Sequence, residues 1–176
     1  MELIEGKPLC DLESDYMRMK PKKRHFILKQ IYSALKKLKD LDIVHRDIKP
    51  DNILLNKKDN TIKILDFGLA TAASKTVRRS GTPGFIAPEI LNSSKKVVDT
   101  FCTKTDIFAI GAIHYCLVVG EHPFDAEDLD GVLENNRNCN LDLKKFELEN
   151  LPLWEFNLLA GALEENQERR ISLQKA

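Results

Sequence analysis

The stretch His45-Arg46-Asp47-Ile48-Lys49-Pro50-Asp51-Asn52 is the part of this chain that decides its fold. It brings three chemically different side chains together within a short segment. The Asp47 carboxylate can orient a hydroxyl group and accept its proton, and the Lys49 ammonium can neutralise nearby negative charge. The Asn52 amide oxygen is a suitable ligand for Mg²⁺. One such octapeptide can arise by chance. Its value as evidence for the fold therefore depends on the residues C-terminal to it.

Three further motifs lie C-terminal to this stretch. They are Asp66-Phe67-Gly68, then Gly81-Thr82-Pro83-Gly84-Phe85, then Ala87-Pro88-Glu89. Taken alone, the first of them is an ordinary turn after a strand. Because all three come in a fixed order after the octapeptide, an accidental match is a poor explanation.

The residues between the octapeptide and Asp66 predict a β-hairpin. Ile53–Leu55 is an apolar run, residues 61–65 alternate between polar and apolar, and residues 58–60 (Lys-Asp-Asn) have turn composition. Such a hairpin would deliver Asp66 close to Asn52. Two oxygen ligands for Mg²⁺ would then converge on one place.

These motifs, in this order, resemble those of the protein kinase family, and the resemblance covers essentially the whole chain. It implies a mainly α-helical fold with a small β-hairpin, the C-terminal lobe of a protein kinase. It also implies ATP and Mg²⁺ as cofactors. The catalytic residues that it implies are Asp47 for the substrate hydroxyl, Lys49 for the γ-phosphate, Asn52 and Asp66 for the metal, and Thr82 as a hydroxyl bonded to Asp47.

The resemblance also suggests how ATP would be held. Residues 1–6 resemble the hinge between the two kinase lobes, which puts Glu2 beside the nucleotide, and residues 7–176 resemble the C-terminal lobe. Leu54 would contact the adenine from below. The eight glycines never form GxGxxG, and the chain offers no candidate for the strand lysine that grips the phosphates. We therefore expect residues 1–176 alone to bind ATP weakly and to transfer phosphate barely detectably.

Five residues receive structural roles from the same resemblance. Asp106 matches an Asp that bonds the backbone of the catalytic loop, although a plain helix N-cap also suits an Asp there. Within that loop, His45 and Arg46 are also expected to be structural. Glu89 and Arg170 match a Glu and an Arg that pair with each other across the sequence.

Arg46 has a second implied role. In the family, an Arg before the catalytic Asp often pairs with a phosphate on the activation segment, which is 66–89 here. The usual phosphothreonine position is occupied by Arg78, so Thr76 and Ser80 become the candidate phosphorylation sites. Unmodified polar loop residues are an equally good interpretation of both.

The remaining chain predicts helical scaffold. Apolar residues recur at helical spacing over 21–41 and 151–163, and residues 106–119 are apolar nearly all round, which predicts a buried helix ended by Gly120. Residues 92–104 are polar and predict a loop. Among the histidines, we interpret His114 and His122 as structural and His25 as helix surface.

Composition excludes several other classes of protein. Lys plus Arg and Asp plus Glu number 27 each, so charge gives no case for a nucleic-acid or anionic-membrane partner. No apolar run is long enough to insert into a bilayer. The four cysteines are widely spaced without a CxxC pair, which predicts a reduced intracellular, cytoplasmic protein without a zinc site.

Two functions stay open at this point. The first is a serine/threonine kinase that phosphorylates protein substrates, since Lys49 and the Gly81-Thr82 pair resemble that branch, with the calcium/calmodulin-dependent kinases as its neighbourhood. The second is a non-catalytic, kinase-like interaction module. The full set of Asp47, Lys49, Asn52 and Asp66 argues for the enzyme, because a binding module has no chemical need for all four.

Overall fold

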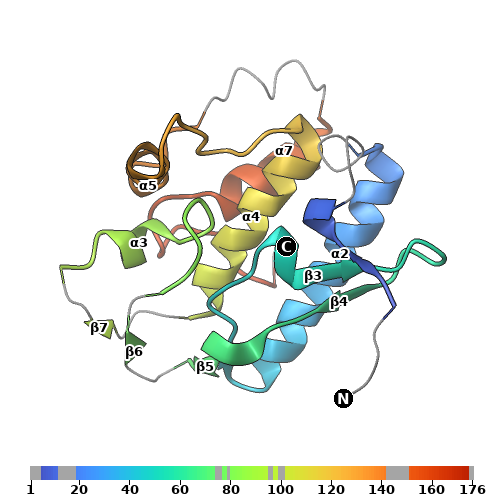
Figure 1. Ribbon diagram of the computed structural model, residues 1–176, viewed down its shortest axis with the longest axis horizontal. Helices are drawn as coiled ribbons and strands as arrows, with labels where there is room; N and C mark the ends of the chain where they lie inside the picture. The colour runs from blue at the N-terminus through green and yellow to red at the C-terminus, as the bar shows by residue number, and fades with distance from the viewer. Residues whose placement is uncertain are drawn as a thin grey trace.

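The computed structural model describes residues 5–11, 19–73, 77–78, 80–94, 97–98, 102–141 and 151–174 (Figure 1). Glu2 and Thr76, which the sequence analysis singled out, lie outside these residues. The helices are α2 (Pro21–Asp40), α3 (Pro88–Leu91), α4 (Thr103–Val119), α5 (Leu129–Arg137) and α7 (Leu153–Ala162). The strands are β1 (Lys7–Pro8), β2 (Ile43–Val44), β3 (Ile53–Leu55), β4 (Ile62–Ile64), β5 (Thr71–Ala72), β6 (Val77–Arg78) and β7 (Val97–Val98). Short 3-10 turns are Leu9–Asp11, Pro50–Asn52 and Phe67–Leu69.

Helix α2 forms where the apolar periodicity predicts it. Pro21 occupies its first turn, where a missing backbone N–H costs nothing, and the helix ends at Asp40, one residue before the predicted end. The side chains that face the core are buried: Ile27, Leu28, Ile31 and Leu35. The helix leads directly into β2 and the loop that carries Asp47, so its packing positions that loop.

Helix α4 is the centre of the fold (Figure 1). It is buried on all sides from Thr105 to Val118 and ends at Gly120, whose φ of 90° is the left-handed conformation that glycine adopts readily. A Cβ on Gly111 would come within 3.0 Å of the Ala162 Cβ, so the missing side chain lets α7 pack closely against α4. Although α4 is apolar, no helix among the described residues is long and apolar enough to cross a membrane.

The predicted hairpin is confirmed. β3 pairs antiparallel with β4, with Ile53 opposite Ile64, and β1 adds a third strand on the other side of β3. The turn is closed by the Asp59 carboxylate, which accepts a hydrogen bond from the Thr61 backbone N–H at 2.9 Å. The second strand of the hairpin ends at Ile64, two residues before Asp66.

Two parts of the sequence prediction need correction. Residues 92–104 are not a loop throughout, because β7 pairs with β6 and α4 begins at Thr103. A two-residue pairing between distant segments leaves no periodic signal in the sequence. Helix α5 was not predicted, and it carries only three apolar side chains, Leu129, Val132 and Leu133, in its nine residues.

Candidate active site

The centre of the candidate site is a contact among three side chains of the predicted catalytic set. The Thr82 hydroxyl donates to Asp47 Oδ1 at 2.7 Å and accepts from Lys49 Nζ at 3.0 Å. Lys49 Nζ also lies 3.4 Å from Asp47 Oδ2. The structure therefore brings a carboxylate, an ammonium and a hydroxyl together at one point, although Thr82 lies far along the chain from the other two.

Asn52 closes the loop that carries Asp47. Its side chain is buried, and its Nδ2 donates to the Asp47 backbone carbonyl at 2.9 Å and lies 3.4 Å from Asp47 Oδ2. With the amide nitrogen held by Asp47, the amide oxygen is the atom of Asn52 that is suited to a cation. The Leu65 backbone N–H donates to the Asn52 carbonyl at 2.8 Å, which brings the residue before Asp66 against this loop.

Asp66 has an unusual backbone conformation. Its φ of 58° and ψ of 76° lie in the left-handed region, which is uncommon for a residue with a side chain. Its Oδ1 accepts a hydrogen bond from the Gly68 N–H at 3.1 Å, and its side chain is exposed. Strained backbone of this kind concentrates at functional sites, so it supports a functional role for Asp66.

The donor set can be compared with the needs of a magnesium ion. Within the described parts of the chain, no three His, Cys, Asp or Glu side chains cluster closely enough to hold a metal by themselves. Mg²⁺ commonly takes one or two protein oxygen ligands and completes its shell with water and phosphates. The oxygens of Asn52 and Asp66 fit that pattern, because β3 and β4 hold their two segments together.

Asp106 holds the backbone of the catalytic loop. Its Oδ2 accepts from the His45 N–H at 2.8 Å and its Oδ1 accepts from the Arg46 N–H at 2.9 Å. The N-cap interpretation is wrong, because α4 begins at Thr103 and Cys102 is its cap residue. Burial raises the pKa of Asp106 to about 6, although the two backbone hydrogen bonds act in the opposite direction.

His45 and Arg46 connect this loop to the segment after β4. His45 is fully buried, and its Nε2 lies 2.9 Å from the Leu65 carbonyl oxygen. The Arg46 guanidinium donates to the Leu69 carbonyl at 2.9 Å and to the Ser80 hydroxyl. Of the two candidate phosphorylation sites, Ser80 therefore lies in contact with Arg46.

Glu89 and Arg170 contact each other, as the resemblance implies. Arg170 Nη1 lies 2.7 Å from Glu89 Oε1 and Nη2 lies 2.8 Å from Oε2, so the ion pair is bidentate. The guanidinium also donates to three backbone carbonyls, those of Lys104, Glu164 and Glu165. Its carbon lies 5.0 Å from the centre of the Phe108 ring.

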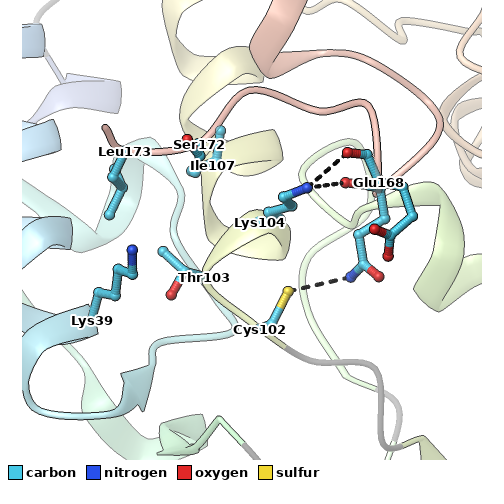
Figure 2. A pocket seen from close by; sticks show the side chains of 9 residues that line it. Lys39, Cys102, Thr103, Lys104, Ile107, Glu168, Ser172 and Leu173 are labelled. Carbon is cyan, nitrogen blue, oxygen red and sulfur yellow. Dashed lines mark hydrogen bonds between the residues drawn. The ribbon is translucent and has the colours of Figure 1, made fainter. Parts of the chain in front are cut away.

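Further hydrogen bonds from the start of α4 stabilise the region around the Glu89–Arg170 ion pair. Figure 2 shows Lys104 reaching the segment before Arg170, where it donates to the carbonyls of Gln167 and Glu168 at 2.8 and 2.9 Å. The Gln167 amide donates to the Cys102 sulfur at 3.4 Å beside it and to Glu89 Oε1 at 3.1 Å. A depression of about 300 Å³ lies here, and its lining includes Cys102, Lys104 and Gln167 but no residue of the catalytic loop.

Leu54 is the residue that the sequence analysis expects to contact adenine. Ile53 and Leu55 are buried in the core, so Leu54, between them in β3, faces the opposite side of the sheet and is half-buried. A Cβ on Gly6 would come within 3.3 Å of the Leu54 Cβ. The end of the hinge-like segment therefore lies beside Leu54.

Two of the buried polar residues that the sequence analysis did not single out hold neighbouring elements together. Asn136 in α5 is fully buried and holds the segment after Thr82, since its Oδ1 accepts from the Gly84 N–H at 2.9 Å and its Nδ2 donates to the Ile86 carbonyl at 2.8 Å. Glu155 is the second. A run of polar residues around Asn136 gave no signal that one of them faces inward.

Glu155 joins three helices. It is fully buried in α7 and lies 2.7 Å from both Arg24 Nε and His25 Nε2 of α2, and 3.2 Å from His114 Nε2 of α4. The structural role expected for His114 is confirmed, but His25 is not simply helix surface. The signal that was available is a single charge within the apolar run around Trp154 and Phe156.

Comparison with known proteins identifies the protein family to which the chain belongs. The profile of the family described as "Protein kinase domain" matches residues 1–176, and the chain belongs to the protein kinase family. A probable myosin light chain kinase of Dictyostelium discoideum is 34% identical over 146 residues, 81% of this chain and 47% of that relative. The serine/threonine-protein kinase PEPKR2 of Arabidopsis thaliana is 31% identical over 175 residues, 98% of this chain and 36% of that relative.

A third relative extends the same picture. The serine/threonine-protein kinase plk-1 of Caenorhabditis elegans is 36% identical over 143 residues, 80% of this chain and 21% of that relative. The chain thus spans less than half the length of each of these curated relatives.

Proposed function

We propose that this chain forms the phosphate-transfer half of a serine/threonine protein kinase, with residues 1–6 as the hinge and 7–176 as the C-terminal lobe. The observation that carries the proposal is the Thr82 hydroxyl, bonded to Asp47 at 2.7 Å and to Lys49 at 3.0 Å. A substrate hydroxyl in its place would lie beside a carboxylate that can accept its proton and an ammonium that can stabilise charge.

The proposal assigns a separate role to each predicted catalytic, metal-binding and nucleotide-binding residue. Asp47 orients the substrate hydroxyl and takes its proton, while Lys49 stabilises the charge on the γ-phosphate. Asn52 and Asp66 would hold Mg²⁺, which neutralises the phosphate oxygens when bound. Leu54 and the hinge-like segment with Glu2 would contact the nucleotide base.

The specificity for serine and threonine rests on the same contact. Lys49 and Thr82 bond each other beside Asp47, and both are residue types that the serine/threonine branch of the family carries at these positions. A protein substrate with a Ser or Thr hydroxyl is therefore the proposed acceptor. Ser80, bonded by Arg46, is the proposed regulatory phosphorylation site among the described residues.

Titration calorimetry with ATP, with and without Mg²⁺, tests the metal site. We expect weak binding that Mg²⁺ strengthens, because Leu54 and the metal ligands form only one wall and a good ligand site buries about 70–90% of its ligand. Asp66→Ala should abolish the effect of Mg²⁺. Asp59→Ala, which removes another exposed turn carboxylate of the same hairpin, should retain it.

The same titration separates the enzyme from the non-catalytic interaction module. A module has no use for a metal site, so ATP binding that ignores Mg²⁺ in the unmodified chain would favour it. If Asp66→Ala keeps the metal dependence, Asp66 is a turn residue only. Micromolar affinity together with robust substrate phosphorylation would contradict the expectation of weak binding.

A further inference from the structure

The segment that carries Thr82 forms a tight turn. Pro83 and Gly84 are its two central residues, and the Phe85 N–H donates to the Thr82 carbonyl at 3.0 Å. Gly84 has a φ of 84°, the left-handed conformation that the third residue of a type II turn requires, and proline suits the second position. Since the proline ring and the closing hydrogen bond restrict the backbone, a displacement of Gly84 also displaces Thr82.

Asn136 of α5 holds this turn through both polar groups of its side-chain amide. It is fully buried, and its Oδ1 accepts from the Gly84 N–H at 2.9 Å while its Nδ2 donates to the Ile86 carbonyl at 2.8 Å. Asn136 is also the buried residue of α5, a helix that lies beside α3. An apolar side chain could fill the same space, so the specific contribution of asparagine is the two hydrogen bonds.

His122 supports the turn from a different side. A Cβ on Gly84 would clash with the His122 ring, so this ring lies against the Gly84 backbone. The same ring meets Phe85 edge-on, with 4.9 Å between the ring centres, and its Nδ1 accepts from the Phe124 N–H at 3.2 Å. His122 therefore limits the space around Gly84, whereas the hydrogen bond to Asn136 fixes the direction of the Gly84 N–H.

The contacts of the turn continue to the catalytic loop through Gly81, the residue before Thr82. A Cβ on Gly81 would come within 2.9 Å of Ile86 Cγ1 and 3.3 Å of the Arg46 carbonyl oxygen, so this glycine packs against both residues. Ile86, whose carbonyl is bonded from α5, thus packs against the residue that precedes Thr82. The Thr82 hydroxyl in turn lies 2.7 Å from Asp47 Oδ1, so contacts made by α5 reach the catalytic carboxylate.

We propose that Asn136 is a positioning residue for phosphate transfer. By holding the backbone of Gly84 and Ile86, it keeps the Thr82 hydroxyl on Asp47 and thereby fixes the orientation of the carboxylate that receives the substrate proton. Asn136 acts through the turn and is not itself a catalytic residue. This role rests on the proposed function, because it assigns Asn136 a part in the same reaction.

Asn136→Ala removes both hydrogen bonds at once. With Mg²⁺, and with ATP well above its dissociation constant, phosphate transfer to a serine-containing protein should fall by about tenfold per folded molecule, since a small misplacement near the reacting groups can cost up to about 100-fold. The affinity for Mg-ATP should not change, because the residues proposed to hold ATP and the metal lie outside the turn. A purely structural role of Asn136 would leave the rate per folded molecule unchanged.

Asn135→Ala is the matched control. Asn135 precedes Asn136 in the same helix, and its Nδ2 donates to the Asp125 carbonyl at 3.1 Å rather than to the turn. Helix α5 therefore loses a side-chain hydrogen bond in both variants, but the turn loses its support only in Asn136→Ala. Transfer by Asn135→Ala should equal transfer by the unmodified chain.

Nuclear magnetic resonance reports the position of Thr82 without any phosphate transfer. In chain isotope-labelled at its threonine methyl groups, the Thr82 signal, identified by its loss in Thr82→Val, should shift in Asn136→Ala and stay in place in Asn135→Ala. In the unmodified chain, the Gly84 amide should exchange with deuterium about 100-fold more slowly than an unprotected amide, because it is buried and bonded. The exchange measurement needs no variant, so it tests the contact even where Asn136→Ala does not fold.

Three results would overturn this role of Asn136. They are transfer by Asn136→Ala at the unmodified rate, a Thr82 signal that does not shift in that variant, and a Gly84 amide that exchanges at the unprotected rate in the unmodified chain. Failure of the proposed function gives a different result, since the unmodified chain would then transfer no phosphate. In that case the Thr82 and Gly84 signals still decide whether Asn136 positions Thr82.

Discussion

Removing either partner of the Glu89–Arg170 ion pair should destabilise the chain strongly and unequally. Arg170 is 2% exposed and donates to both Glu89 oxygens and to three backbone carbonyls. Glu89→Ala leaves that buried cation with carbonyl partners only. Breaking one side of a buried pair typically costs about 3–5 kcal/mol, and we expect the lower end of this range for Glu89→Ala.

Arg170→Ala should cost more. It removes the same pair, leaves three carbonyls without their donor and empties the space beside the Phe108 ring. The upper end of the same range, about 5 kcal/mol, is therefore the expected loss. Glu89 is not left entirely alone in this variant, since the Gln167 amide still donates to it at 3.1 Å.

The stability of the double variant gives the coupling energy between Glu89 and Arg170. In the background of Arg170→Ala, Glu89→Ala removes only the hydrogen bond from Gln167, so the double variant should be less stable than Arg170→Ala by no more than about 1 kcal/mol. The coupling energy from urea unfolding would then be about 2–3 kcal/mol. Arg169→Ala, an exposed neighbour, should change stability by less than about 0.5 kcal/mol. Strictly additive losses would show that the two residues do not interact in solution.

Two further predictions concern residues around the site. Burial lowers the pKa of His114 in the folded chain. Below about pH 6.5 this imidazole is therefore protonated in the unfolded chain but stays neutral in the folded one. Stability should therefore fall as the pH drops from 7.5 to 5.5, by at most about 1.4 kcal/mol per pH unit from this group, and His114→Gln should reduce the fall in urea unfolding at the two pH values. A Cβ on Gly84, whose φ is 84°, would clash with the His122 ring, so Gly84→Ala should destabilise by more than about 1 kcal/mol. Adding His122→Ala should recover only part of that loss, and full recovery in thermal unfolding would show that backbone strain contributes nothing.

Long periodic segments and ordered motifs were predictable from the sequence, because each carries its signal locally. α2 and the β3–β4 hairpin form within a few residues of the predicted bounds. The approach of Thr82 to Asp47, and of Arg170 to Glu89, was implied by resemblance rather than by any local pattern. The structure adds the distances and the backbone conformation of Asp66.

The parts that could not be predicted depend on tertiary contacts. Glu155 sits in an apolar run whose pattern does not say that its carboxylate turns inward, toward Arg24 and two histidines. Asn136 is one of several polar residues in α5, and only packing against the Gly84 segment makes it buried. The pairing of β6 with β7 joins two short segments with no periodicity of their own.

The most direct test of the proposed phosphate transfer compares the unmodified chain with Asp47→Asn. Labelled phosphate is followed from the γ-position of ATP to a serine-containing protein, with Mg²⁺, concentrated chain and long incubation. We predict slow transfer that Asp47→Asn reduces by about 10²–10⁴-fold, the usual contribution of a general base, while Asp51→Asn, an exposed neighbour, transfers at the unmodified rate. Transfer by Asp47→Asn at the same rate as the unmodified chain, or no transfer by the unmodified chain above the rate in buffer, would contradict the account.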